Sequence, residues 1–512
     1  MKIINIIYLI ILVVFSSCED YLEKVPNYSA YAEGYFDSEK AAQESRIGLY
    51  AKMWLRGHDS NDRPIYNRYL TDNRYTLDAT TDQLYAQYDW GASKSIYQGI
   101  ITPETGGLVS GFYKEAFSVI AAANDHIANV GAMSDDLFEN MTKEAYLADA
   151  RFLKAFYYFY LTELYGGVPL YKEKIANNDL DAYEIAKSSK AEIVEYILSE
   201  LDIAINSLPE KSYDGFITKG AAQALKAKIL LQNGQWQLAA NAAEEVIKSG
   251  QFSLDPDYFN LFIKKGQANS NEIIFASEFQ YPDVAHSLTR TLVHSSGGTP
   301  RQEFVDQYLM SDGLAVGVSS LESADYQNRD PRFYLSIYPE NHDWYDAIGK
   351  LVKYEPTQTG WYIKKYFDRD ITDDNSIHVG GSSEQSIIHL RYADVLLMYA
   401  EAKYELGQFD QTVYDQTIKL IRNRVGMANV NVDTMQDTDK FNLIKYERNI
   451  ELAFEGHRRF DLLRWGELGE TIVTLTDPLG VAIVWKDHFT LWPFTNSELN
   501  LNPNLVQNLG YN

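Results

Sequence analysis

The stretch AAQALKAKILLQNGQWQLAANAAEEVIKSG at residues 221–250 decides the fold class. Its apolar residues recur every three or four positions on both sides of Gly234, which is the spacing of two helices joined by a tight turn. The small and apolar residues that share the facing sides are Ala224, Ala227, Leu230 and Leu231, then Ala239, Ala242 and Ala243. Small side chains let two helices approach closely, so the stretch predicts a helical hairpin.

Two further segments repeat this pattern. Residues 391–424 (RYADVLLMYAEAKYELGQFDQTVYDQTIKLIRNR) align Gly407-Gln408-Phe409 with Gly234-Gln235-Trp236, and residues 146–171 match the first helix, which ends at Gly166-Gly167. The unit resembles the tetratricopeptide helix pair. Any hairpin with alanine-rich faces is the alternative, but three occurrences in one chain favour true repeats.

The amino-acid composition and the periodicity change between the repeats. Residues 55–113 and 255–390 are rich in Tyr, Trp, Asp, Asn and Gly and lack a sustained helical period, while EIIFASEF at 272–279 predicts a strand. Such long connections in a compact protein are usually functional. We therefore expect a mainly α, tetratricopeptide-like scaffold with long irregular aromatic-rich loops and a few short strands, forming a single body over 39–512.

The composition excludes several classes of protein. The chain has 512 residues, 46% hydrophobic and 23% charged, which is typical of a globular protein rather than a disordered one. Lys plus Arg number 46 against 71 Asp plus Glu, a net charge of -25. Nucleic acids and anionic lipid head groups would be repelled by such a chain, so we expect no nucleic-acid partner.

The first residues have the features of an export signal. Residues 1–17 (MKIINIIYLIILVVFSS) combine a basic Lys2, an apolar run shorter than the roughly 20 residues of a membrane span, and two small serines. The single cysteine, Cys18, follows at once, and a lone cysteine excludes an internal disulfide or a CxxC metal site.

This ending resembles a bacterial lipoprotein signal, in which the cysteine becomes the new N-terminus and carries acyl chains. An ordinary secretory signal with a chance cysteine is the alternative. We expect residues 1–17 to be a lipoprotein signal peptide, Cys18 to be the lipid anchor, and polar residues 18–38 to be a lipidated tether.

Six segments along the chain together match a known family: SCEDYLEKVP (17–26), ARFLKAFYYFYLTELYGGVPL (150–170), DPRFYLSIYP (330–339), RYADVLLMYAEAKYELG (391–407), YERNIELAFEGHRRFDLLRWG (446–466) and NLNPNLVQNLGY (500–511). They resemble the SusD/RagB family of outer-membrane lipoproteins. The similarity spans nearly the whole chain, and the segment at 446–466 is highly specific by itself. In the signal, Phe15 is bulkier than the usual leucine.

The resemblance implies a protein held by acylated Cys18 in the outer-membrane lipid and facing the extracellular side. It implies a lid over a SusC-like TonB-dependent transporter, which captures glycan, or in some members peptide, and passes it to the barrel. It also implies no enzymatic activity. A peptide-binding (RagB-like) member is therefore one alternative, and a secreted glycoside hydrolase or a purely structural scaffold are others from different classes.

The charges within residues 446–466 admit two interpretations. Glu447, Arg448, Glu451 and Glu455 alternate with large apolar residues, as do Arg458, Arg459, Asp461 and Arg464. Such charges become partly buried, and arginine–carboxylate pairs can satisfy them. An acid–base carboxylate pair is the functional alternative. We favour the structural interpretation.

A sugar site needs flat aromatic rings beside hydroxyl-binding side chains, and two loop stretches have that mixture. The candidates in residues 69–91 are Asp72, Asn73, Arg74, Asp82, Tyr85, Tyr88 and Trp90; those in 279–288 and 339–346 are Tyr281, His286, Trp344 and Tyr345. These aromatic residues could instead pack the loops onto the scaffold. We expect at least one of Tyr88, Trp90 and Trp344 to line the site.

Other chemistry is sparse. The chain has no HExxH, no clustered His/Cys set, no GxSxG and no Walker or dinucleotide glycine pattern, so we expect no catalytic residue, metal or cofactor. Asp368, Asp370 and Asp373 could hold Ca²⁺, but the loop lacks EF-hand spacing, and a solvated acidic loop is favoured.

Overall fold

The structure of the protein is a computed structural model. It describes residues 32–58, 64–66, 70, 74–176, 179, 181–280, 284–294, 297–321, 324–340, 356–367 and 383–511. The expected signal peptide, Cys18 and the first part of the tether lie outside these residues, as does the acidic loop with Asp368, Asp370 and Asp373.

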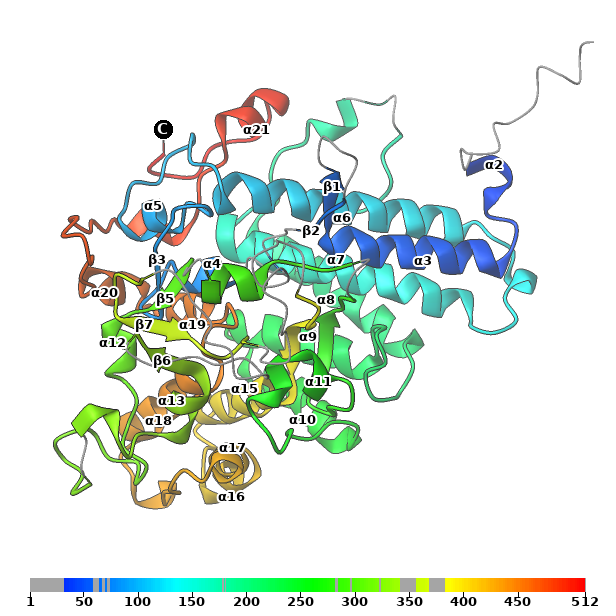
Figure 1. The fold of residues 1–512 in the computed structure, drawn as a ribbon. Helices are drawn as coiled ribbons and strands as arrows, with labels where there is room; N and C mark the ends of the chain where they lie inside the picture. The colour runs from blue at the N-terminus through cyan, green and yellow to red at the C-terminus, as the bar shows by residue number, and fades with distance from the viewer. Residues whose placement is uncertain are drawn as a thin grey trace, which may run out of the picture.

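A stack of antiparallel helices forms one side of the molecule (Figure 1). Helices that follow one another in the chain pack side by side from α6 to α10, and α10 packs in turn on α15. The members are α3 (Glu39–Trp54), α6 (Leu108–Gly131), α7 (Lys143–Tyr165), α8 (Lys190–Ser207), α9 (Lys219–Gln232), α10 (Trp236–Ser249) and α15 (Tyr392–Glu405). The predicted scaffold of helical hairpins is confirmed.

The turns of the two aligned hairpins have the same hydrogen bonds. The Gly234 N–H donates to the Leu231 carbonyl at 3.1 Å, and the Gln235 N–H donates five residues back. Gly407 and Gln408 repeat both bonds, and the two glycines have φ values of 68° and 67°. Because this left-handed backbone favours glycine, the Gly-Gln pair in the sequence correctly indicated the turn of each hairpin.

Helix α7 lies at the centre of the stack. Every side chain from Phe152 to Tyr165 is buried, and the helix packs between α6 and α8. A helix that is apolar nearly all round belongs inside a protein, which explains the run FLKAFYYFYLTELY. Its N-terminus is capped by Thr142, whose hydroxyl accepts from the Ala145 N–H.

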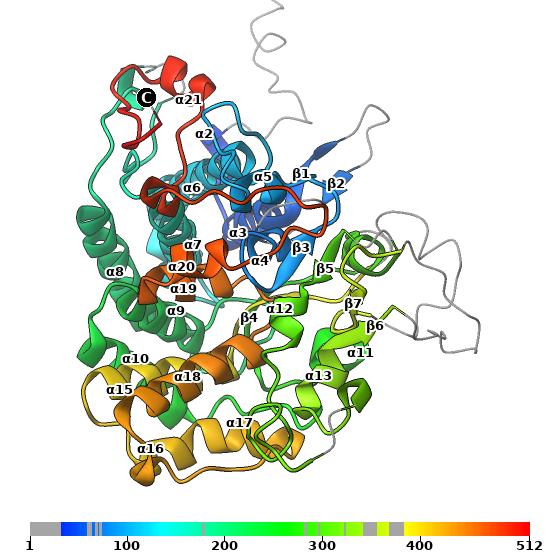
Figure 2. The same ribbon diagram turned by 90° about the vertical axis from the view of Figure 1, so that its left-hand side faces the viewer.

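The described residues between 255 and 390 lie on the opposite side of the molecule, where β5, β6, β7, α11 and α13 are labelled in Figure 2. The strands form antiparallel pairs: β1 (Leu55–His58) with β2 (Pro64–Tyr66), β3 (Leu84–Ala86) with β5 (Gly298–Pro300), β4 (Ile273–Ser277) with β8 (Ile387–Arg391), and β6 (Ile337–Pro339) with β7 (Trp361–Ile363). Strand β4 confirms the strand predicted from EIIFASEF.

Further helices, most of them shorter, connect these parts. They are α2 (Ala32–Tyr35), α4 (Tyr75–Asp78), α5 (Ser93–Tyr97), α11 (Lys264–Gln267), α12 (Gln302–Val305), α13 (Pro331–Ser336), α16 (Gln411–Gln416), α17 (Ile418–Val425), α18 (Asp437–Glu451), α19 (Arg458–Trp465), α20 (Leu468–Val473) and α21 (Asn496–Leu501). Helix α6 begins at Leu108, inside the stretch expected to be irregular up to 113, because Leu108, Val109 and Phe112 already face the core.

The loop-rich side has a hydrophobic core of its own. Phe304 packs edge-on against Phe454 at 5.3 Å between ring centroids, and Phe333 packs in the same way against Trp361 at 5.9 Å. These contacts hold the long connections as fixed structure. In the described part of the chain, no helix combines the length and the apolarity that crossing a membrane requires.

Candidate functional site

Two exposed aromatic rings stand at the end of strand β3. Tyr88 and Trp90 stack with ring centroids 4.8 Å apart and planes 12° from parallel. The Trp90 side chain is 57% exposed and that of Tyr88 is 39% exposed. Large aromatic residues are normally covered by a protein's own packing, so two parallel rings open to solvent form a platform for a flat, partly apolar ligand. We call these two residues the aromatic pair.

Local structure fixes the turn that carries the aromatic pair. Asp89, between the two rings, accepts from the Lys94 N–H and from the Ser95 hydroxyl, both at 2.8 Å, and so ties the turn to the start of α5. Gly297 lies under the indole ring: a Cβ there would come within 3.0 Å of Trp90. The platform is therefore held by hydrogen bonds on one side and by a close backbone approach on the other.

The turn also meets the second loop region. The Gln87 Nε2 donates to the Pro356 carbonyl at 3.0 Å, and the Gln358 N–H donates back to Gln87 Oε1 at 3.3 Å. Residues 87–90 and 356–358 thus lie side by side although some 270 positions separate them. Gln87 and Asp89 flank Tyr88 in the chain, and the Gln87 contact brings Gln358 to the same turn, so amide and carboxylate groups of the kind that bind hydroxyl groups belong to this part of the surface.

The predicted site residues divide into three groups. Tyr88 and Trp90 are exposed and adjacent. Arg74 and Tyr85 are buried at 4% and 0% exposure, below the surface that a ligand could reach. The predicted residues that lie outside the described part of the chain are Asp72, Asn73, Tyr281, Trp344 and Tyr345.

The two buried candidates support the fold. The Arg74 Nη1 donates to the carbonyl of Ile388 in strand β8 at 2.8 Å. The Tyr85 ring lies under the Lys94 ammonium at 4.9 Å and the Arg301 guanidinium at 5.4 Å. Both residues anchor the polypeptide that leads to the aromatic pair.

Asp82 and His286 are buried as well. Burial alone would raise the pKa of Asp82, but the Arg458 guanidinium, paired with it at 2.8 Å, holds this pKa below its usual range. Burial lowers the pKa of His286 to about 4, and its Nε2 lies 2.8 Å from the Gln385 carbonyl. A neutral imidazole that donates to a carbonyl is a structural element.

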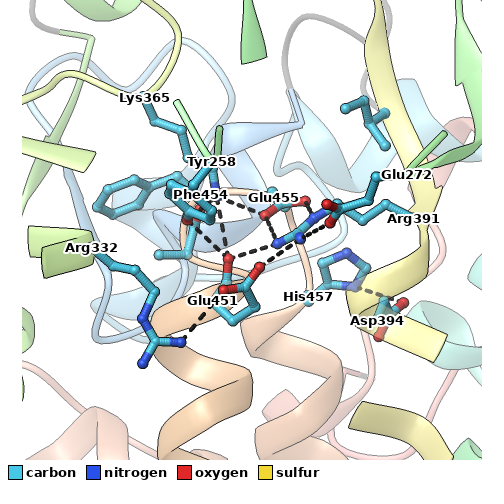
Figure 3. A network of polar contacts seen from close by, with 12 residues as sticks. Tyr258, Glu272, Arg332, Lys365, Arg391, Asp394, Glu451, Phe454, Glu455 and His457 are labelled. Carbon is cyan, nitrogen blue, oxygen red and sulfur yellow. Dashed lines mark hydrogen bonds and ion pairs between the residues drawn. The ribbon is translucent and has the colours of Figure 1, made fainter. Parts of the chain in front are cut away.

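The segment at 446–466 forms a buried network of ion pairs, which we call the charge cluster (Figure 3). Its centre is Glu451, which contacts Arg391 at 2.7 Å, Arg424 at 2.6 Å and Arg332 at 3.4 Å. Burial alone would raise the pKa of Glu451, but the three guanidinium groups outweigh burial and hold the pKa far below its usual range. The carboxylate therefore stays ionised inside the protein.

Glu455 is satisfied in the same way. Arg391 donates to both of its oxygens at 2.8 Å, and the Lys365 ammonium adds a third contact at 2.7 Å (Figure 3). Burial opposes ionisation here too, but these cations lower the pKa of Glu455. Arg391 joins strand β8 to the chain after α18, so the pair connects distant segments.

The remaining charges of the segment follow this pattern, with one exception. Arg448 forms a bidentate pair with Asp461 at 3.0 and 2.9 Å, and Arg464 forms another with Glu401 at 2.8 Å. Arg459 instead donates to the Phe489 carbonyl at 3.2 Å, and burial lowers its pKa to about 10. The arrangement of buried, paired charges predicted from the sequence is confirmed.

Sequence reasoning did not single out Gln87, Asp89 or Gln358. Asp89 could have been found, because it stands between Tyr88 and Trp90. The partnership of Gln87 with Gln358 depends on the tertiary fold and has no local signal. Among the described residues, no group of His, Cys, Asp and Glu side chains is arranged to hold a metal ion.

Known proteins resemble the chain throughout. Residues 265–511 match the model of the SusD family, and residues 20–231 match a model described as starch-binding associating with outer membrane. A SusD-like protein of Formosa agariphila is 28% identical, with 99% of each chain covered.

Solved structures share the fold. A SusD-like carbohydrate-binding protein from Bacteroides fragilis superposes with a TM-score of 0.78 at 22% identity, covering 92% of this chain and 100% of its own. A laminarin-binding SusD-like protein gives 0.70 at 21% identity, covering 93% and 100%.

Proposed function

Because this chain belongs to the SusD/RagB family, we propose that it binds glycan at the cell surface and that the aromatic pair is its binding platform. The observation that carries the proposal is the stacked, exposed arrangement of Tyr88 and Trp90. A pyranose ring offers an apolar C–H face to the rings and hydroxyl groups to the surrounding amides and carboxylates. Named relatives that bind carbohydrate or laminarin support this ligand class.

The proposed mechanism is capture without bond cleavage. The buried carboxylates of Glu451 and Glu455 already have arginine or lysine partners, which lower the pKa of both groups and keep them ionised, whereas a general acid must carry a proton. The net charge of -25 favours neutral glycans over polyanionic ones, because like charges repel.

The proposal extends to delivery. The leader and Cys18 support an acyl anchor in outer-membrane lipid, and the family description places starch-binding relatives at the outer membrane. A protein fixed beside a SusC-like TonB-dependent transporter raises the local concentration of captured glycan, so weak individual contacts suffice.

Native affinity gels test the function directly. The chain from residue 19 onward is run through gels that contain laminarin, starch or no polysaccharide, and a parallel assay measures new reducing ends. We expect retardation by at least one neutral polysaccharide and no reducing ends. Release of reducing ends would identify a hydrolase, while binding of oligopeptides and of no glycan would select the peptide-binding alternative.

A further inference from the structure

A cleft of about 580 Å³ lies between α6, residues 171–175 with Tyr183, and α21. We call it the α6–α21 cleft; it shares no lining residue with the aromatic pair. Helix α21 lies above α6 in both ribbon views (Figures 1 and 2). The volume is within the range of roughly 300–1,000 Å³ that is usual for small-molecule sites.

A continuous row of aromatic rings forms the wall of the cleft. Tyr113 contacts Phe117 at 4.7 Å between centroids, Phe117 contacts Tyr171 at 5.6 Å, and Tyr171 contacts Tyr183 at 6.1 Å. Tyr183, at the mouth, is 41% exposed. The Tyr171 hydroxyl donates to the Tyr183 carbonyl at 2.7 Å and so fixes the wall in place.

The cleft has two acceptors that lack a donor among the described residues, and Asn124 is the first. The Asn124 Nδ2 donates to the Tyr171 and Glu173 carbonyls at 3.0 and 3.1 Å, which fixes the direction of the amide. Its Oδ1 is buried and accepts no hydrogen bond from the described residues, and Asn124 is only 4% exposed. Buried acceptors normally have a donor, so this site lacks one.

Glu498 is the second acceptor. Burial raises the pKa of this half-buried carboxyl, and the opposing attraction comes from Lys114 across the cleft. Among the described residues, no ion pair or donated hydrogen bond satisfies its carboxylate. Asp125, by contrast, pairs with Lys174 at 3.3 Å.

We propose that the α6–α21 cleft is a second saccharide-binding site, which takes the terminal one or two residues of a neutral oligosaccharide; the assignment rests on the glycan-binding function proposed above. The ligand must offer apolar faces to the rings and several donors to Asn124 and Glu498. Sugars have both. The lining has two lysines against three carboxylates, so its charge is nearly balanced and an ionic ligand gains little.

The two sites differ in the part of a glycan that they suit. The aromatic pair stands on the open surface and can support a residue in the middle of a chain, whereas the cleft is walled on several sides and suits a chain end. A glycan long enough to reach both sites would be held by two contacts at once, so its affinity would exceed that of a short fragment.

The test uses a chain without the aromatic pair, Tyr88→Ala with Trp90→Ala, so that only the cleft can respond. Saturation-transfer NMR is recorded with the methyl glycosides of glucose, galactose, mannose and xylose. We expect transfer to at least one of them. Adding Ala121→Trp, at an exposed position on the cleft, should reduce it about tenfold. The matched control Ala132→Trp, on the exposed end of α6, should leave it unchanged.

The outcomes separate this inference from the proposed function. No transfer in the chain without the aromatic pair, or the same transfer after Ala121→Trp, overturns the second site, whereas the function stands if the intact chain still binds polysaccharide in gels. Saturation transfer in that chain, combined with no retention of polysaccharide by the intact chain, would support the cleft as a sugar site and contradict the aromatic pair as the binding platform. Glu498→Gln should weaken sugar binding only about fivefold, because an amide oxygen still accepts. Displacement of the sugar by choline would reassign the cleft to cations.

Discussion

The charge cluster and the aromatic pair place their side chains in opposite environments. The cluster gathers ionised side chains where water is absent, and Glu451 and Arg391 are at most 1% exposed. The aromatic pair leaves apolar rings where water is plentiful. The difference teaches that the most chemically conspicuous segment of a sequence can serve architecture, while the proposed recognition surface consists of two stacked rings that are open to solvent.

Breaking the charge cluster should have the largest effect. Glu455→Ala leaves Arg391 and Lys365 without this partner in a buried site, so the free energy of unfolding should fall by about 3–5 kcal/mol. Urea titration followed by circular dichroism measures it. The exposed Glu245→Ala should change stability by less than about 0.5 kcal/mol. A fully stable Glu455→Ala protein with altered glycan binding would refute the structural role.

Asp78, a buried carboxyl close to the charge cluster, provides a pH-dependent test of stability. Burial raises the pKa of Asp78 to about 7, although the Gly456 N–H donates to it at 2.7 Å. The folded state then holds a proton that the unfolded state loses near pH 4. The protonated Asp78 carboxyl therefore contributes to the free energy of unfolding at low pH, and this contribution disappears as the pH rises through 7. Asp78→Asn imitates the protonated acid at every pH. Relative to the native chain, its free energy of unfolding should therefore increase by on the order of 2 kcal/mol as the pH rises from 5 to 8.

Asp82, four positions away, is the matched control. Arg458 holds its pKa below the usual range, so its carboxylate is ionised over the whole interval from pH 5 to 8. Asp82→Asn should therefore destabilise the protein by the same amount at both pH values. Equal pH profiles for the two variants would contradict the opposite pKa shifts.

Removing the aromatic pair should affect binding and leave the fold intact. Trp90→Ala should weaken retention in polysaccharide gels about tenfold, because the ring loses its stacking contact with the sugar. The melting temperature should be unchanged, since the side chain is 57% exposed. Replacing Tyr88, Trp90 and Trp344 together with alanine without loss of glycan binding would eliminate the platform.

The smallest effect should come from the support of the turn. Asp89→Ala removes the two hydrogen bonds to the start of α5, so the aromatic pair should be less well ordered and affinity should fall about threefold. Asp89→Asn should recover most of it, because one oxygen still accepts. Isothermal titration of both variants with the retained polysaccharide measures the difference, and an Asp89→Ala affinity equal to that of Trp90→Ala would show that the rings act only through the turn.

The scaffold could be predicted because its signals are local. Gly234 and Gly407 each mark a left-handed turn that few other residues adopt, and the apolar period around them indicates helices. The pairing of charges in 446–466 followed from elementary electrostatics, since ionised groups among large apolar residues need partners.

The site could be predicted only in part. Tyr85 and Tyr88 lie three positions apart in one aromatic stretch, yet one is buried and the other exposed. What separates them is the pairing of β3 with β5, in which Tyr85 lies opposite Thr299, more than two hundred positions away. No local pattern encodes that partner, so residue type alone could not tell support from surface.

The charge cluster also constrains how the chain can mature. Arg391 is joined to Glu272 and to Glu451, 119 and 60 positions away along the chain. A growing polypeptide therefore carries Glu272 and Arg391 for some time before residues 447–464 leave the ribosome, and until then the locking contacts cannot close. The nascent chain therefore lacks the complete network of ion pairs during most of its synthesis, and the native state forms only after residues 447–464 have emerged.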